Sequence, residues 1–400
     1  MPLDIGFLFS EPFRRYLIAI LIVSIGIVTF TILSGDGGDY ALYIMQWAAM
    51  IQTGDPWILE HNGKDIPGNA YGPLHGLLGY LLPVYWLGPK LVLVASTLLS
   101  FFVIVAHAAK HGDLNDRTFV AGLFILPLCP MVFFSSYDAG GNDGFAALCV
   151  GLACIARHHR WFALTGALLA VGALMKFYPL LFAPLFAIDS KRVVHLRLLV
   201  VCAGVFLLAM LASYAVWGES ILTPFTFSGE REAKGLSILR FMQPLDSMPT
   251  FAPFYGFLLD TNTLTVAAFA ALFAIFASVS NMDWRISTLV GILLIFAIYK
   301  VGHSVFLMSW LTVILFLNFD TEKSLRNDVV RASVPIIVYI SVLKIGYMLT
   351  GGVDDRGWTG SWEFVRLYMS VPYVVMIGYF LYALRHHLRP QEVRFPTLRF

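Results

Sequence analysis

The sequence predicts an all-α, polytopic integral membrane protein, and three observations support this fold class. Of the 400 residues, 58% are hydrophobic and 13% are charged, whereas roughly 25% of the residues in a soluble domain are charged. The apolar residues form blocks of about 15 to 22, the length that crosses a hydrocarbon core of about 30 Å as a helix. No segment has the composition of a soluble domain, so we expect one transmembrane domain over residues 1–400.

Hydropathy predicts about twelve spans. The first, starting at Tyr16, is too long for the core of a signal peptide and should remain as an anchor. The region 73–109 is too long for one span, so residues 73–87 are expected to form a re-entrant or tilted helix. The expected spans are 16–34, 88–109, 118–135, 143–156, 161–175, 177–189, 196–217, 263–280, 285–299, 303–319, 333–350 and 369–384.

The distribution of charge predicts the orientation. Arg14 and Arg15 precede the first span, while residues 34–72 contain five acidic residues and one lysine. Because basic loops remain in the cytoplasm, both termini should be cytoplasmic, in an inner or plasma membrane. Three long segments, 35–72, 218–262 and 351–368, then face the periplasm or its equivalent. Long ordered loops commonly carry function, so 35–72 and 218–262 are expected to cap an active site.

Several partners and cofactors are excluded. A formal net charge of +2 without a basic stripe argues against nucleic acid. No glycine-rich loop follows a strand, so a nucleotide-sugar domain is not expected. Two aspartates, Asp36 and Asp39, cannot fill the shell of a hard cation, and neither a metal nor a cofactor is expected. The four cysteines lie in apolar segments without metal-ligand spacing and should be core residues: Cys129, Cys149, Cys154 and Cys202.

The first outside loop carries a candidate general base. It begins Ser-Gly-Asp-Gly-Gly-Asp-Tyr at residues 34–40. A carboxylate at a membrane surface can take the proton from a sugar hydroxyl if its surroundings adjust its pKa. Asp39 is the candidate base and Asp36 a second acid candidate. The spacing alone equally fits a glycine-rich turn whose aspartates cap a helix that starts near Tyr40.

Three motifs in the first 190 residues resemble glycosyltransferase family 87 of the GT-C superfamily. Asp39 followed by Tyr43, and later by Tyr-Gly-Pro-Leu at 71–74, resembles its first outside loop. Gly-Gly-Asn at 140–142 resembles its Gly/Asn step, and Lys-Phe-Tyr-Pro at 176–179 resembles its Lys-x-Tyr-Pro segment.

The resemblance implies an inverting transfer from a polyprenyl-phosphate sugar, most commonly mannose, with Asp39 as the catalytic base. Pentoses remain open as the donor sugar. The acceptor can be a glycolipid, a polysaccharide end or a lipid-linked intermediate. The resemblance also places Tyr43, Asn142, Lys176 and Tyr178 among the residues that bind the donor, which reaches the site through the membrane lipids.

The leaving phosphate needs cations or hydrogen-bond donors to hold it. Besides Lys176, the candidates outside the membrane are Arg231, Arg240, Lys300 and His303. Each has a structural alternative. Lys176 can be a snorkelling lysine at a helix end, His303 can be a hydrogen-bonded structural residue, and residues 225–240 can form an amphipathic helix on the bilayer surface.

Two other classes of function remain open. A flippase or transporter of a lipid-linked sugar would suit twelve spans and broken helices, although no internal repeat is visible. An oligosaccharide ligase or polymerase would rely on Arg231, Arg240 and His303 without a catalytic aspartate. The substitution Asp39→Asn distinguishes them, because only the transferase needs that carboxylate.

Overall fold

A computed structural model describes residues 11–35, 39–66, 68, 70–82, 86–111, 124–189, 193–280, 282–320, 323–349, 368–388 and 397–399. This part of the chain is almost entirely helical, and its strands are two or three residues long. The expected outside loop 351–368 lies almost wholly outside the described residues. The all-α class predicted from hydropathy is thus what the structure shows.

Five described helices are long and apolar enough to cross a membrane. Four of them lie within α1 (Glu11–Leu33), α4 (Gly88–His111), α15 (Asn262–Val279) and α18 (Lys323–Leu349). The fifth, Leu196–Glu230, begins with α11 (Leu196–Trp217) and continues through the short helical segments that follow it. A sixth span is made if the bent pair Pro130–Asp138 and Asp143–His158 counts as one. The structure therefore shows an integral membrane protein with five or six such helices, and the predicted number of twelve is not confirmed.

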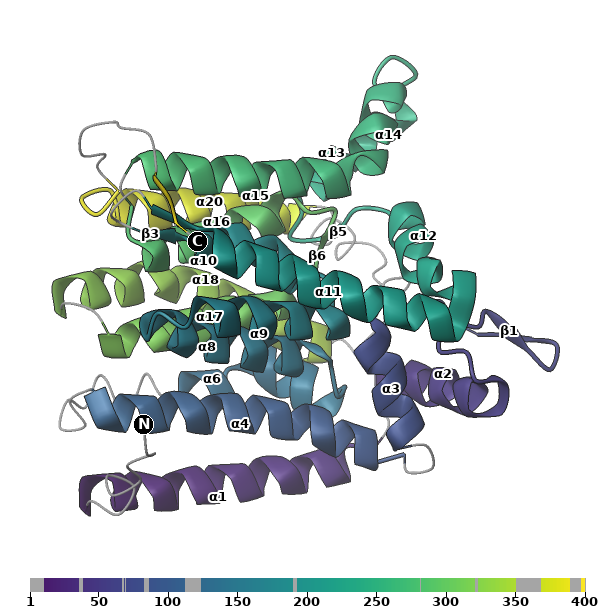
Figure 1. The fold of residues 1–400 in the computed structure, drawn as a ribbon, viewed down its shortest axis with the longest axis horizontal. Coiled ribbons are helices and arrows are strands. Elements are labelled where there is room, and N and C mark those ends of the chain that lie inside the picture. Colours follow the sequence, from purple (N-terminus) through teal and green to yellow (C-terminus); the bar gives the residue numbers. More distant parts are fainter. Residues whose placement is uncertain are drawn as a thin grey trace.

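Shorter apolar helices occupy the remaining expected spans. They are α9 (Phe162–Met175), η3 (Tyr178–Phe182) with α10 (Ala183–Ala187), α16 (Trp284–Ile298), η6 (Ser304–Phe306) with α17 (Leu307–Asp320), and α20 (Ser370–Ala383). The segment 73–87, expected as a re-entrant or tilted helix, contains the nine-residue α3 (Pro73–Leu81), which is steeply inclined to α1 and α4 (Figure 1).

The expected continuous span 118–135 is wrong within its described part. Residues 124–138 contain α6 (Ile125–Leu128), α7 (Pro130–Val132) and the π-helix η2 (Phe133–Asp138) instead. Cys129 is extended, with φ −61° and ψ 130°, because a following proline disfavours the helical conformation. Hydropathy is averaged over a window of residues, so a hydropathy profile does not detect this break.

The core is built around α8 (Asp143–His158), which packs against α4, α9 and α17. Its buried positions are mostly small, including Gly144, Ala146, Ala147 and Gly151, and small residues allow helices to approach closely in a membrane. The helix α9 also packs closely against α11. A Cβ added at Gly166 would lie 2.3 Å from the Leu198 carbonyl oxygen.

The segments predicted as outside loops gather at one end of the long helices (Figure 1). They contain α2 (Asp39–Thr53), the hairpin β1 (Glu60–His61) and β2 (Lys64–Asp65), α12 (Thr223–Glu230), α13 (Ile238–Met242) and α14 (Ala252–Asp260), with 3-10 turns η4 (Gly218–Leu222) and η5 (Gln243–Ser247). The strand β5 (Lys234–Gly235) pairs in parallel with β6 (Val301–Gly302). A separate sheet joins β3 (Ile188–Asp189), β4 (Val193–His195) and β7 (Thr397–Arg399).

The close approach of α9 and α11 gives a test of the packing. We expect Gly166→Ala to lower the melting temperature of the protein in detergent, because the new methyl group pushes α11 away. The matched control is Gly204→Ala on α11, where an added Cβ meets nothing within 4 Å. Alanine there should be neutral or stabilising by up to about 1 kcal/mol. Equal melting temperatures for the two variants would contradict the close packing.

Candidate functional site

Three contacts join the segment after α2 to the end of α11 and the turn that follows it. The Ser220 hydroxyl donates to Asp55 Oδ2 at 2.6 Å, and the Trp217 indole donates to the Gly54 carbonyl at 2.9 Å. The Trp57 and Trp217 rings lie edge to face with centroids 5.5 Å apart. These contacts fix the segment that follows α2 against the end of α11, so residues from both predicted loops can contribute to one site.

The helix α2 begins at Asp39, as the predicted start near Tyr40 required. The side chain of Asp39 and the whole of Asp36 lie outside the described part of the chain. One helical turn beyond Asp39, the buried Tyr43 hydroxyl lies 2.8 Å from the Tyr71 hydroxyl. Tyr43 therefore links the helix that starts at the candidate base to the segment that precedes α3.

That segment lies directly against the end of α9. The Gly72 N–H donates to the Met175 carbonyl at 3.1 Å. A Cβ at Gly72 would lie 2.2 Å from the Leu174 carbonyl oxygen, a distance that no side chain tolerates. The Tyr-Gly-Pro sequence at 71–73 thus places Tyr71 beside Lys176, the residue that directly follows Met175 and caps α9.

Lys176 ends α9 in an extended conformation. Its ammonium donates to Asp143 Oδ2 at 2.9 Å, and its side chain is 14% exposed. The same ammonium lies 4.5 Å from the centroid of the Phe306 ring and 5.6 Å from that of Tyr71. A carboxylate and two aromatic faces therefore hold this cation in one place.

Asp143 was not found from the sequence. It is buried in the first turn of α8, where the helix dipole favours a negative charge. Its second oxygen accepts the Tyr178 hydroxyl at 3.4 Å, and that hydroxyl is also 3.2 Å from Ser309 Oγ. The feature of the sequence that could have revealed Asp143 is its position directly after Gly-Gly-Asn, where a carboxylate begins an otherwise apolar helix.

Asn142 contacts a histidine that was also missed. Its amide nitrogen lies 2.9 Å from His75 Nδ1, and both side chains are buried. The His75 ring packs against Tyr43 and Tyr71, with centroids 5.0 and 4.6 Å away. Burial lowers the pKa of His75 to about 3, so this ring is neutral at physiological pH.

Two polar atoms of this pair lack partners within the described residues. They are His75 Nε2 and Asn142 Oδ1. Buried polar groups in proteins are nearly always hydrogen-bonded, so unpaired atoms in a buried cluster indicate a place where a water or a ligand hydroxyl is needed.

Arg231 and His303 lie together, and His303 also contacts Phe306. The parallel pairing of β5 and β6 brings the segments around them into register, and Arg231 Nη2 lies 3.3 Å from His303 Nε2. The His303 ring is 5.5 Å from the Phe306 ring, which also contacts the Lys176 ammonium. The cluster formed by Tyr43, Tyr71, His75, Asn142, Asp143, Lys176, Tyr178, Arg231, His303 and Phe306 is called the polar cluster below.

The other two predicted cations bind the main chain. The Lys300 ammonium donates to the Gly229 and Leu259 carbonyls at 2.7 and 3.3 Å, near the ends of α12 and α14. Burial lowers the pKa of Lys300, and Asp260 opposes that shift. Arg240 donates to the Ala233 carbonyl at 3.3 Å. These contacts give both residues a structural role: Lys300 stabilises two helix ends, and Arg240 holds the chain just before β5.

The amphipathic helix considered for residues 225–240 is wrong. The helix α12 ends at Glu230, and a strand follows before α13. Gly235 has φ +64°, and a Cβ there would lie 2.4 Å from the Gly302 carbonyl oxygen. The pairing with β6 therefore requires glycine and breaks the helix.

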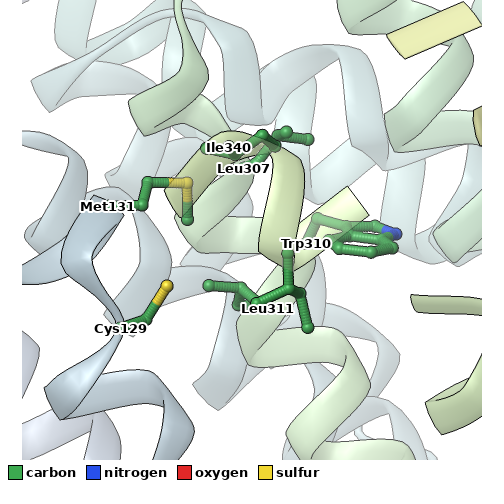
Figure 2. A pocket seen from close by; sticks show the side chains of 7 residues that line it. Cys129, Met131, Leu307, Trp310, Leu311 and Ile340 are labelled. Carbon is green, nitrogen blue, oxygen red and sulfur yellow. The ribbon is translucent and has the colours of Figure 1, made fainter. Parts of the chain in front are cut away.

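Neither the cysteines nor the apolar pocket of the described residues adds chemistry to the polar cluster. The four cysteines are unpaired and buried, as predicted. No group of three or more His, Cys, Asp or Glu side chains suited to a metal occurs in the described part of the chain. A small apolar pocket lies near Trp310 and Ile340 (Figure 2). Its lining carries no charged side chain, so it cannot bind a phosphate.

The family model of glycosyltransferase family 87 matches residues 69–299. The match includes Asn142, Lys176 and Arg231, and it extends beyond residue 190, where sequence motifs gave only a likeness of hydropathy. Asp39 and His303 lie outside the matched range. No curated protein and no solved structure matches the chain.

The ion pair at the centre of the polar cluster can be tested by a double-mutant cycle. Asp143→Asn and Lys176→Met should each destabilise the protein by about 3 kcal/mol, because each leaves a buried group without its partner. The double variant should lose less than the sum, with a coupling of about 1 to 3 kcal/mol. Unfolding in detergent micelles measures all four proteins. Strictly additive losses would show that the pair contributes no interaction energy.

A second test separates the cations that hold the main chain from those in the polar cluster. Lys300→Met should lower the melting temperature strongly, because the carbonyls at the ends of α12 and α14 lose their donor. Arg231→Met, at a partly exposed position, should lower it by much less. Comparable melting temperatures would contradict the structural role of Lys300.

Proposed function

Because this chain belongs to glycosyltransferase family 87, we propose that it transfers a sugar from a polyprenyl-phosphate donor to a lipid or polysaccharide acceptor. The proposed donor sugar is mannose, and the proposed site faces the extracytoplasmic side of the membrane. Family membership supports the transfer of a sugar. The donor, the orientation and the roles of individual residues below are part of the proposal.

One observation carries the proposal: the polar cluster joins the start of α2 to three cationic or basic side chains. Residues 39 and 43 are one helical turn apart, so they lie on the same face of α2. Tyr43 on that face contacts Tyr71, and Tyr71 contacts the Lys176 ammonium. This arrangement supports a carboxylate at position 39 next to groups that can hold a phosphate.

The proposed reaction is a direct displacement with inversion. The acceptor hydroxyl oxygen attacks the anomeric carbon while Asp39 takes the hydroxyl proton. The bond between the anomeric carbon and the phosphate oxygen breaks, and the electron pair leaves with the polyprenyl phosphate. A phosphate of this kind needs no proton to leave, so one carboxylate is sufficient. Asp36 remains a second acid candidate.

Arg231 and His303 are the proposed first contacts of the donor phosphate. Arg231 offers a planar fork of donors that suits phosphate oxygens, and His303 lies within 3.3 Å of it. Lys176 adds a positive charge whose position Asp143 fixes. In a site closed to water, donors fixed in advance stabilise developing charge more strongly than mobile ones.

The sugar is proposed to contact the neutral side of the polar cluster. The amide of Asn142 and the hydroxyls of Tyr43 and Tyr178 are uncharged groups that can bind sugar hydroxyls. His75 Nε2 and Asn142 Oδ1 lack partners within the described residues, as expected of groups that await a ligand or a water. Lys300 and Arg240 maintain the fold of the segment that carries Arg231.

Transfer of radiolabelled mannose from polyprenyl-phosphate-mannose to native lipids tests the proposed function. Asp39→Asn should fold but lose activity by at least about 100-fold, because the general base is removed. The matched control is Asp65→Asn, an exposed acidic residue of the same segment, which should keep the wild-type rate.

Either of two results would count against the proposal. An active Asp39→Asn variant would remove Asp39 as the base and favour a ligase or flippase mechanism. A wild-type protein that is silent with mannose and with other polyprenyl-linked sugars would reject the donor class.

A further inference from the structure

Lys90 is a buried cation that the proposed reaction does not use. It is the third residue of α4 and is 0% exposed. Its ammonium donates to Ser34 Oγ and to the Gly35 carbonyl, both at 2.7 Å. These two residues follow the end of α1 directly, so Lys90 holds the chain just before residues 36–38.

Lys90 also holds the chain just after those residues. Its main-chain N–H donates to the Tyr40 hydroxyl at 3.0 Å, and its ammonium lies 5.7 Å from the centroid of the Tyr40 ring. Tyr40 is 0% exposed and is the second residue of α2. The side chain and the main-chain N–H of Lys90 together therefore hold both described ends of the segment that leads to Asp39.

The turn before α8 packs against Lys90 and Tyr40. Gly140 has φ +61°, and a Cβ there would lie 3.0 Å from both Lys90 Cγ and Tyr40 Cδ2. The Ser34 hydroxyl is also 3.5 Å from the Tyr137 carbonyl. Lys90 thus lies where α1, α2, α4 and the turn that leads to Asn142 meet, and its movement would disturb all four.

The charge of Lys90 has a further effect. A buried ammonium is costly unless negative groups lie near it. Asp138 interacts electrostatically with Lys90, and Lys344 of α18 faces the same carboxylate. Asp36 and Asp39 belong to the chain whose ends Lys90 holds. A fixed positive charge here favours the ionised form of neighbouring carboxylates.

We propose that Lys90 is a positioning residue for Asp39, which fixes the start of α2 and supplies the positive charge that keeps the general base ionised. This inference rests on the proposed function. A general base works only when it is deprotonated, so the charge and the geometry serve the same step.

The pH profile of kcat/KM tests this role. A positive charge lowers the pKa of a nearby carboxylate, so loss of the charge raises that pKa and the rate falls at a higher pH on the acidic side. Lys90→Met should lower kcat/KM at least about tenfold and move the acidic limb upward by about one pH unit. Lys90→Arg keeps the charge and should leave the limb in place. Among the described residues, Tyr40 and Asp138 interact with Lys90, and Lys344 interacts with Asp138. These groups, and Asp36 three residues before Asp39 in the sequence, are unchanged in both variants.

A merely structural lysine would give a different result. Lys90→Met would then lose rate or stability while the acidic limb stays where it is in the wild type, and the proposal would be overturned. A Lys90→Met variant with wild-type rate and profile would overturn it equally.

Two milder variants keep the proposal testable if Lys90→Met does not fold. Tyr40→Phe and Ser34→Ala each remove one contact of Lys90 and keep its charge. Both should lower kcat several-fold without moving the acidic limb, and wild-type kinetics in both would reject the positioning role.

The same assays separate failure of the role of Lys90 from failure of the proposed function. If the wild type transfers sugar and Asp39→Asn does not, the function stands, and only the Lys90 variants decide this inference. If the wild type transfers no polyprenyl-linked sugar, the proposed function fails and the role of Lys90 fails with it.

Discussion

The ion pair between Lys176 and Asp143 is the interaction on which the rest of the polar cluster depends. It joins the end of α9 to the start of α8, and Tyr178 adds η3 through the same carboxylate. Neither charge is stable alone in a poorly hydrated interior, so the two helices must meet at these residues. Tyr71 and Phe306 then pack on the ammonium, and through them the cation is linked to Tyr43 and to His303.

The sequence pointed to the members of the polar cluster that belong to continuous motifs, and it missed the members that only folding brings to them. Lys176, Tyr178 and Asn142 stand in recognisable runs. Their partners do not: Asp143 lies 33 residues from Lys176, and His75 lies 67 residues from Asn142. A single sequence contains no record of such pairings. The same limit applies to helix breaks. Hydropathy found the long apolar helices but averaged over Pro130, and the amphipathic pattern of residues 225–240 did not reveal the break at Gly235, where local geometry determines the structure.

Counting charges also could not tell which cations hold the main chain and which contact other side chains. Lys300 and Arg240 use their donors on main-chain carbonyls. Arg157, near the other end of α8, does the same with Phe186 and Ile188 at 2.8 and 2.7 Å. Lys176 instead donates to the Asp143 carboxylate, and Arg231 lies 3.3 Å from the His303 ring nitrogen. The distinction follows from which neighbour offers unpaired carbonyls, usually a helix end, and that neighbour is fixed only in the folded protein.

The neutral state of His75 has a consequence for the environment in which the protein works. The outer surface of a cell exchanges protons freely with its surroundings, so a site that faces outward meets whatever acidity the medium has. A histidine of ordinary pKa would change its charge in a mildly acidic habitat and alter how a carbohydrate is recognised. Since the pKa of His75 is about 3, the ring stays neutral in a mildly acidic medium and keeps the same hydrogen-bonding pattern. Under the proposed function, sugar binding beside this ring would therefore be insulated from acidification of the medium.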